Sequence, residues 1–533
     1  AGLIHAAEET KARTVYRHPD GHEDGDSPAY RCLAYTEMLD DVILMEDVAG
    51  GTKAMRSKGE EYLPRHPMER QEKYPNRVKI AIAFNALQRT ISGLVGMVFR
   101  RDPVIVEEKP DSAIVEHLKN IDQRGRDIGL FGRAVGEKTL RDAHSWIHVE
   151  APDLGPDVKN RQQDREAGRR PYWISVGKRQ AINWRYEVRD GKPVLKLFVY
   201  LENSSEPVGQ FGERVVERIR VLREVGGVID GVEHVQIQTE LWELKEAEGD
   251  KKQPEWELVE GPDVLDIGRI PVVFVPAKPS DRAGEFRSDP PLRDLAYEQV
   301  EHYRVRSDRQ RSLTFSAIAV PYAFGKEVTD ETGQAKVGWG PDGMMLVNDP
   351  EAKAGIIESH GHGLSAMKDE LDDIDGRMAR LGLQMLAGTP SPRATTATER
   401  LLDKNEDDAS LVLFAQSIET ALNEALALHA EWRSLETPVT LKLNRDFHVQ
   451  LMDPKLIEVL SELVAAGRLS TETLWMLLVQ GEVLDEEFEA KAEWERIQQE
   501  TEERMASDPI LREMRRQFGA DDDEEDEAGE VAA

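Results

Sequence analysis

The stretch GLSAMKDELDDIDGRMARLGLQML, residues 363–386, carries the clearest periodic pattern in the chain. Its apolar residues follow one another at alternating spacings of three and four, which brings them to one face of a helix. A seam of this kind packs one helix continuously against another, either within the subunit or between subunits. The residues of this packing seam are Leu364, Met367, Leu371, Ile374, Met378, Leu381 and Met385.

A candidate partner for this helix comes before it in the sequence. Residues 291–320 open with Pro291, which suits the first turn of a helix, and Asp289 stands where it can cap that turn. The segment 321–362 is rich in glycine and turn residues, so we expect a small β-rich insert there. Because the insert returns the chain, we expect the helices of 291–320 and 363–388 to be antiparallel.

These two helices carry opposite charges where they would meet. The first is basic towards its end and the second is acidic near its start, so each cluster also complements the dipole of its own helix. In an antiparallel pair the clusters lie side by side, and we expect ion pairs worth about 0–1 kcal/mol each where exposed. Contact of the arginines with a partner or with DNA is the alternative. The residues concerned are Arg304, Arg306, Arg309, Arg311, Asp369, Asp372, Asp373 and Asp375.

The spacing of apolar residues and the composition divide the rest of the chain into further segments. Residues 389–397 contain two prolines, so we expect a loop there, and we expect a very long helix followed by a returning strand within 398–446. Residues 447–533 are expected to be helical, and they end in an acidic tail. Residues 1–290 start with helical spacing and change to short β-rich runs between 146 and 276. The fold class is therefore α+β, mainly helical, with antiparallel strands.

Composition limits the classes of function. The 533 residues exceed one domain several times over, and the net charge of -32 argues against coating by nucleic acid, which needs clustered Lys and Arg. One cysteine, Cys32, allows no disulfide within the chain and no multi-cysteine zinc site. The sequence has no stretch of about 18 consecutive apolar residues, so we expect no membrane contact.

The sequence contains none of the common enzyme motifs. The sequence has no phosphate-binding loop, zinc-protease helix, nucleophile elbow or dinucleotide fingerprint, so we expect no catalytic residues and no cofactor. Glu358, His360 and His362 lie close together, but a zinc site needs ordered ligands and this stretch is glycine-rich. We therefore expect no metal site.

Several blocks resemble phage portal proteins of a group often described only as a domain of unknown function. They include YLPRHPMERQEKYPNR (62–77) with FNALQRTISGLVGMVFRRDP (84–103), and PYWISVGKRQAINWR (171–185). GRIPVVFVPA, PPLRDLAYEQVEHYRVRSDRQRSLTFSAIAVPYAFG, the 363–386 stretch and TATERLLDKNEDDASL follow in the same order. The resemblance covers roughly residues 60–435 and rests on the order of the blocks.

The resemblance implies an architecture for each segment. Residues 1–290 would hold the N-terminal region and an α+β wing, and 291–320 and 363–388 would form a two-helix stem around a clip at 321–362. Residues 389–397 would be the channel loop, 398–446 the long wing helix with its strand, and 447–533 the helical crown. Hydroxyls and one base in the loop could contact DNA phosphates, although Arg393 also fits a plain exposed arginine. The loop residues are Thr389, Ser391, Arg393, Thr395 and Thr396.

The resemblance also implies a function and partners. A homo-oligomeric ring, twelve-fold in the virion, would sit at one capsid vertex and conduct double-stranded DNA during packaging and ejection. Its partners would be major capsid and scaffolding proteins, the terminase, and then head-completion, adaptor and tail proteins, with assembly in the host cytoplasm. An acidic channel would repel phosphates and let the duplex slide. The alternatives are another virion structural protein, such as a head–tail adaptor or internal head protein, and an acid-dependent nuclease or hydrolase.

Overall fold

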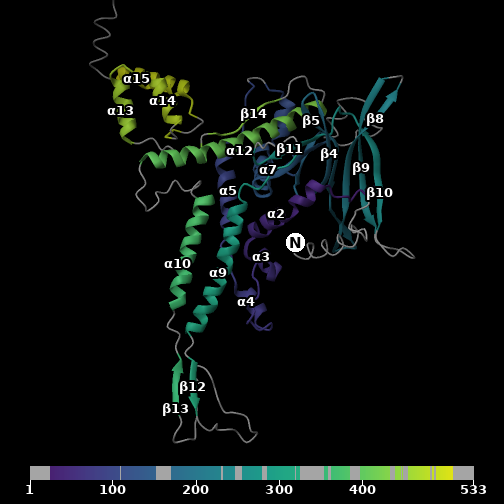
Figure 1. Ribbon diagram of the computed structural model, residues 1–533. Coiled ribbons are helices and arrows are strands. Elements are labelled where there is room, and N and C mark those ends of the chain that lie inside the picture. The colour runs from purple at the N-terminus through teal and green to yellow at the C-terminus, as the bar shows by residue number, and fades with distance from the viewer. Residues whose placement is uncertain are drawn as a thin grey trace, which may run out of the picture. The chain divides into compact units, whose positions relative to one another are not determined.

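The protein is described from a computed structural model (Figure 1). Helices take 49% and strands 24% of the chain, which confirms the α+β class. The chain divides into two compact units, residues 1–445 and 446–533, which are treated separately. The residues that the structure describes are 25–107, 110–151, 170–229, 232–245, 255–278, 285–317, 320–324, 353–357, 362–383, 397–432, 439–445, 447, 454–480, 483–484 and 488–507.

The first unit begins with helices whose apolar residues recur at helical spacing. In α5 (Ala86–Val98), Leu87, Ile91 and Val95 are fully buried along one face. The side chain of Asn85 caps this helix by accepting a hydrogen bond from the backbone N–H three residues later, at 3.2 Å. The other helical segments before the sheets are α2 (Leu33–Ala49), α3 (Gly51–Lys58), η1 (Gly59–Glu61), α4 (Tyr74–Ile80), α6 (Ser112–Leu118) and α7 (Ile128–Asp142).

Two antiparallel sheets form the β-rich part, one of three strands in the order β11-β2-β3 and one of five in the order β10-β9-β8-β5-β4. β2 is buried along almost its whole length because α7 and a later helix, α12, both contact it. The strands are β2 (His144–Glu150), β3 (Tyr172–Gly177), β4 (Ala181–Arg189), β5 (Lys192–Leu201), β8 (Arg218–Ile229), β9 (Val232–Lys245), β10 (Glu255–Leu265) and β11 (Val272–Pro276), with a separate hairpin of β6 (Ser204–Val208) and β7 (Gly212–Val216).

An aromatic cluster joins the two sheets. Trp146 of β2 is fully buried, and its ring centroid lies 4.8 Å from that of Phe198 in β5 and 4.9 Å from that of Phe274 in β11. Trp184 of β4 and Phe286 complete the cluster at 5.9 and 5.5 Å from Trp146. Because large aromatic rings bury much apolar area in tilted and edge-to-face contacts, this cluster holds the two sheets together.

The long helix α12 (Ala397–Trp432) is a core helix of the first unit. Its stretch Ser410–Trp432 is long and apolar enough to cross a membrane by composition, and half of that window is buried. The helix packs on β11 and β2, where the hydroxyl of Ser417 donates a 2.7 Å hydrogen bond to the Pro276 carbonyl. The indole of Trp432 donates to the Val149 carbonyl at 3.0 Å. Burial against the sheet therefore accounts for its apolar composition.

The segment 291–388 has the helix–insert–helix order that its sequence pattern indicated. α9 (Arg293–Ala317) and α10 (His362–Met378) lie side by side, and α10 runs on into a π-helical turn, η3 (Ala379–Leu383) (Figure 1). In the insert, β12 (Val320–Phe324) and β13 (Lys353–Ile357) pair antiparallel. The strand expected after α12 is the short β14 (Leu441–Lys442), which pairs with β1 (Val104–Ile105).

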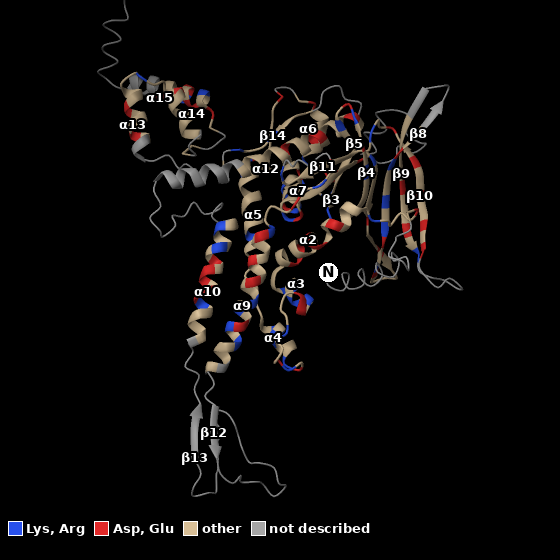
Figure 2. Ribbon diagram, in the orientation of Figure 1, with Lys and Arg blue, Asp and Glu red and all other residues tan. Residues whose placement is uncertain are grey.

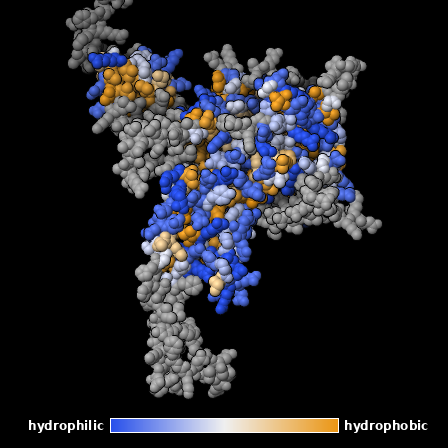
Figure 3. Space-filling view, in the orientation of Figure 1, coloured by the Kyte–Doolittle hydropathy of each residue, from blue (hydrophilic) through white to orange (hydrophobic). Residues whose placement is uncertain are grey.

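The second unit contains three helices in its described part: α13 (Pro454–Ala465), α14 (Thr471–Gln480) and α15 (Ala490–Ser507). Trp475 of α14 packs edge-on against Trp494 of α15, with ring centroids 6.3 Å apart. Apolar side chains nevertheless gather on the surface of this unit (Figure 3). The exposed ones are Val459, Met476, Val483, Trp494 and Ile497.

The aromatic cluster makes a direct prediction about stability. Replacing the fully buried Phe198 by alanine should lower the free energy of unfolding by about 3–5 kcal/mol, because it leaves a cavity between the sheets. The matched control is Phe211→Ala, since Phe211 is 91% exposed, and it should change that free energy by less than about 0.5 kcal/mol. Chemical denaturation followed by tryptophan fluorescence measures both. Equal effects of the two variants would contradict the assignment of the core.

Candidate functional site: the two-helix column and its anchor

The two helices α9 and α10 form an antiparallel column. The guanidinium of Arg377 donates a 2.9 Å hydrogen bond to the carboxylate of Glu298, and further along the pair His302 Nε2 lies 3.5 Å from Asp375 Oδ1. Residue numbers rise along one helix while they fall along the other, which fixes the antiparallel direction. Burial lowers the pKa of His302, so this imidazole is neutral at pH 7 and its contact with Asp375 is not an ion pair.

Part of the predicted packing seam is buried, as expected. Leu371, Ile374 and Met378 are buried, whereas Leu364 and Met367 are half-buried. Met385 lies outside the described residues.

Leu381, expected on the same seam, is 40% exposed. The π-helical turn at Ala379–Leu383 adds a residue to the turn and rotates the following side chains away from the α-helical phase. Gly382 takes the inward place instead, where a Cβ would come within 2.6 Å of Leu295 Cδ2 and 2.8 Å of Thr90 Oγ1. A glycine is therefore what lets η3 approach α9 and α5 closely.

The charged residues of the column have partners other than those that the sequence predicted. Arg304 donates to the backbone carbonyl of Tyr62 at 2.9 Å, and Arg311 pairs with Glu69 at 2.9 Å. The two arginines are seven residues apart and so lie on one side of α9, which faces the segment 62–77 and not α10.

The other charged residues that the sequence predicted to pair across the column form no ion pair between α9 and α10 within the described part of the chain. Arg306 and Arg309 make none with α10, and the Nε atom of Arg309 is buried without a hydrogen-bond partner. Asp369, Asp372 and Asp373 are exposed on α10, where Figure 2 shows a run of acidic residues.

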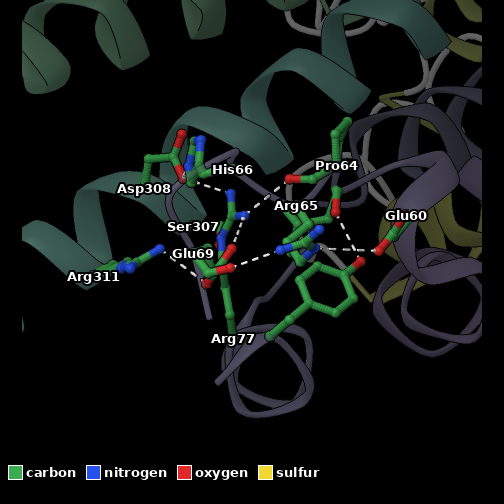
Figure 4. A network of polar contacts seen from close by, with 11 residues as sticks. Glu60, Pro64, Arg65, His66, Glu69, Arg77, Ser307, Asp308 and Arg311 are labelled. Atoms are coloured by element: carbon green, nitrogen blue, oxygen red, sulfur yellow. Dashed lines mark hydrogen bonds and ion pairs between the residues drawn. The ribbon is translucent and has the colours of Figure 1, made fainter. Parts of the chain in front are cut away.

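A buried network around Arg77 of α4 anchors α9 to the segment 62–77 (Figure 4). The Arg77 guanidinium is 5% exposed and donates to Glu69 at 3.1 Å and to the Pro64 carbonyl at 3.0 Å. Towards α9 it reaches Asp308 at 2.6 Å and the Ser307 hydroxyl at 3.3 Å. Five donors in a planar fork suit Arg for such convergent bonding.

Glu69 is the counterpart of Arg77 in this network. Its carboxylate is 2% exposed and accepts from Arg77 on one oxygen and from Arg311 of α9 on the other. Its backbone carbonyl accepts from Arg65 at 2.7 Å, and His66 lies 3.1 Å from the same Asp308 oxygen that Arg77 contacts. Each buried charge therefore has an opposite charge within hydrogen-bond distance, as low-dielectric surroundings require.

A second buried polar contact holds α9 nearer its N-terminal end than the Arg77 network does. The side chain of Gln299 is fully buried, accepts from the backbone N–H of Leu87 at 2.9 Å and donates to the Val48 carbonyl at 3.1 Å. One side chain thus provides a hydrogen-bond partner for a backbone N–H in the first turn of α5 and for a backbone carbonyl in the last turn of α2. Two independent contacts thus fix α9 against the N-terminal helices.

These anchoring residues were missed as a functional group from the sequence. The block YLPRHPMERQEKYPNR carries a family resemblance and no motif of its own, yet four of its residues take part in the network: Arg65, His66, Glu69 and Arg77. The signal that could have found them is the density of charged residues in a segment flanked by prolines. The sequence does not reveal that their partner is α9, because α9 lies some 230 residues away along the chain.

A groove beside the column and the possible metal ligands complete the description of this region. A groove of about 470 Å³ runs along α9, and its polar lining consists of glutamates, arginines and tyrosines. Within the described part of the chain no group of three His, Cys, Asp or Glu side chains is placed to hold a metal ion. Glu358, His360, and the loop residues Thr389, Ser391, Arg393, Thr395 and Thr396, lie outside the described residues.

The anchor makes a prediction about stability. Arg77→Ala should lower the free energy of unfolding by about 3–5 kcal/mol, because it leaves the buried Glu69 and the Asp308 carboxylate without a principal partner. Arg89→Ala is the matched control, since Arg89 is exposed on α5, and its effect should stay below about 0.5 kcal/mol. Urea denaturation compares the two, and a cost for Arg77→Ala no larger than for Arg89→Ala would show that the network does not anchor α9.

Comparisons with known proteins bear on this part of the chain. Residues 291–433 match the family described as Domain of unknown function (DUF4055). No curated protein sequence matches the chain at a significant level. A chain of the solved structure "Virion of native gene transfer agent (GTA) particle" is similar with a TM-score of 0.37 and 10% identity, over 74% of this chain and 89% of that chain. A chain of "Neck of empty GTA particle computed with C6 symmetry" is similar with a TM-score of 0.38 and 12% identity, over 74% of this chain and 90% of that chain. The family match thus spans the column, its insert and α12.

Proposed function

We propose that this protein is a portal-type structural protein of a tailed-phage-like particle, which assembles into a ring and conducts double-stranded DNA through its centre. The observation that carries the proposal is the antiparallel column of α9 and α10, held at Gln299 and Arg77 by buried contacts to the N-terminal helices. A rigid column that ends in an insert is what a ring needs to line a channel and to present a docking end. The order of sequence blocks that resembles portal proteins supports the same proposal.

Charge supports a conduit more than a DNA-binding protein. The chain carries 101 acidic and 69 basic residues, so a ring of many copies would surround DNA with a strongly negative potential. Acidic groups that face the channel repel phosphates and keep the duplex from adhering to the wall. Tight binding would instead need clustered Lys and Arg along the path of the DNA.

The proposal assigns binding roles and no catalysis. In it the insert at 321–362 docks the terminase during packaging and head-completion or tail proteins afterwards, while the wing contacts capsid and scaffolding proteins. The ring resides at one vertex of the virion after assembly in the host cytoplasm. No cofactor or metal takes part in this role.

Ring formation is the first test. The purified full-length protein should elute as a large homo-oligomer and show rings with a central hole in negative-stain images, with twelve subunits as the expected number. Mass photometry gives the subunit count independently of the images. A protein that stays monomeric from nanomolar to micromolar concentration, at low and at physiological salt, would contradict the proposal and favour another virion structural role.

The loop between the column and α12 gives a second test. Deleting residues 390–395 should leave ring assembly intact and impair DNA packaging or retention, because the proposal puts this loop at the constriction of the channel. Assembly is measured by mass photometry, and packaging by the DNA content of particles. Loss of rings on deletion would make the loop a structural element instead.

A further inference from the structure

One side of the column presents acids without partners. Asp369, Asp372 and Asp373, here called the acidic stripe, are exposed on α10. Helical spacing puts them opposite Leu371 and Ile374, which face α9. Among the described residues, none of the three forms an ion pair. The acidic stripe therefore faces outward from the subunit.

The other side of α9 carries a basic surface. Residues 51–80, here called the basic segment, contain eight Lys or Arg and four Asp or Glu, which gives a net charge of +4 in a chain whose net charge is -32. The basic segment contacts α9 through Arg77. Four of its bases are exposed and form no ion pair with the residues that the structure describes. They are Lys53, Arg70, Lys73 and Lys79, and they stand among three exposed acids of the same segment, Glu60, Glu61 and Glu72.

The two surfaces lie at the same level along the column. Arg77 meets α9 at Ser307 and Asp308, at the end nearer the insert. On α10, Asp375 stands beside His302, and the acidic stripe continues from there towards the insert because the helices are antiparallel. α10 and the basic segment flank α9 on different sides (Figure 1). Each subunit thus presents a negative flank and a positive flank at matching levels.

Matching flanks are what a ring of identical subunits requires. In a head-to-tail ring the contact joins two different patches of one chain, and rotation about the ring axis keeps each patch at its own level. We propose that the acidic stripe of each subunit docks against the basic segment of the next copy. The acidic stripe then belongs to the subunit interface and does not line the DNA channel.

This contact would set the register between neighbours. Complementary charge guides encounter and disfavours misaligned pairings that place like charges together. Because both surfaces are exposed before assembly, salt should weaken their attraction over a Debye length of about 10 Å at 0.1 M. Assembly should therefore need higher protein concentration as the salt concentration rises.

The inference rests on the proposed function, and a charge-swap experiment separates the two. The acid-reversed variant is Asp369→Lys, Asp372→Lys and Asp373→Lys, and the base-reversed variant is Arg70→Glu, Lys73→Glu and Lys79→Glu. Either one alone should raise the protein concentration for half-maximal ring assembly by at least about tenfold, and combining them in one chain should restore assembly. Circular dichroism checks that each variant is folded.

A matched control reverses three exposed acids elsewhere, Glu257→Lys, Glu260→Lys and Asp263→Lys on β10, and should assemble as the wild type does. A wild-type protein that forms no rings would overturn the proposed function together with this inference. Wild-type rings that persist unchanged in both charge-reversed variants would overturn the inference alone. Loss of rings in both variants without restoration in the combined variant would also overturn it, because the pairing is then not between these surfaces.

Discussion

The orientation of the column depends first on an ionic network in which the buried Arg77 pairs with Glu69 and with Asp308. Taking these charges out of water is costly, and the cost is offset only because each one has an opposite charge and further hydrogen bonds in place. The contact joins a short helix near the N-terminus to α9, far along the sequence. The network therefore acts mainly by orienting α9. It fixes which side of α9 faces the N-terminal helices and leaves the opposite side free to contact α10.

The remaining parts of the column follow from that constraint. Gln299 holds the next level of α9 by satisfying the ends of α2 and α5, and Gly382 lets η3 come close to α9 and α5. Once α9 is oriented, the buried face of Leu371, Ile374 and Met378 brings α10 alongside it. The acids of α10 are then turned outward. A pattern of charge on the surface of the column thus has its origin in buried contacts.

The sequence predicted much of this arrangement, and what it missed has physical causes. Apolar spacing is local, so the helices at 291–320 and 363–388 and the long helix after them were expected close to their observed bounds. The exposure of Leu381 was not expected, because a π-helical turn changes the phase without a mark in the apolar pattern. The partners of Arg304 and Arg311 were predicted on α10 because that helix carries the opposite charge. The positions of these two arginines around α9 instead turn them towards residues 62–77. The network around Arg77 was missed because its two halves are joined only by the fold.

In the proposed ring, the column is the wall of a shared channel that is built from copies of one acidic chain and kept in register by charge. A cryo-EM map of the purified oligomer measures this most directly, because it shows where α9 and α10 lie relative to the symmetry axis. We expect a closed ring in which successive columns stand side by side around a central opening wide enough for a DNA duplex. An oligomer without a central opening, or a ring whose columns do not surround that opening, would contradict the proposed channel.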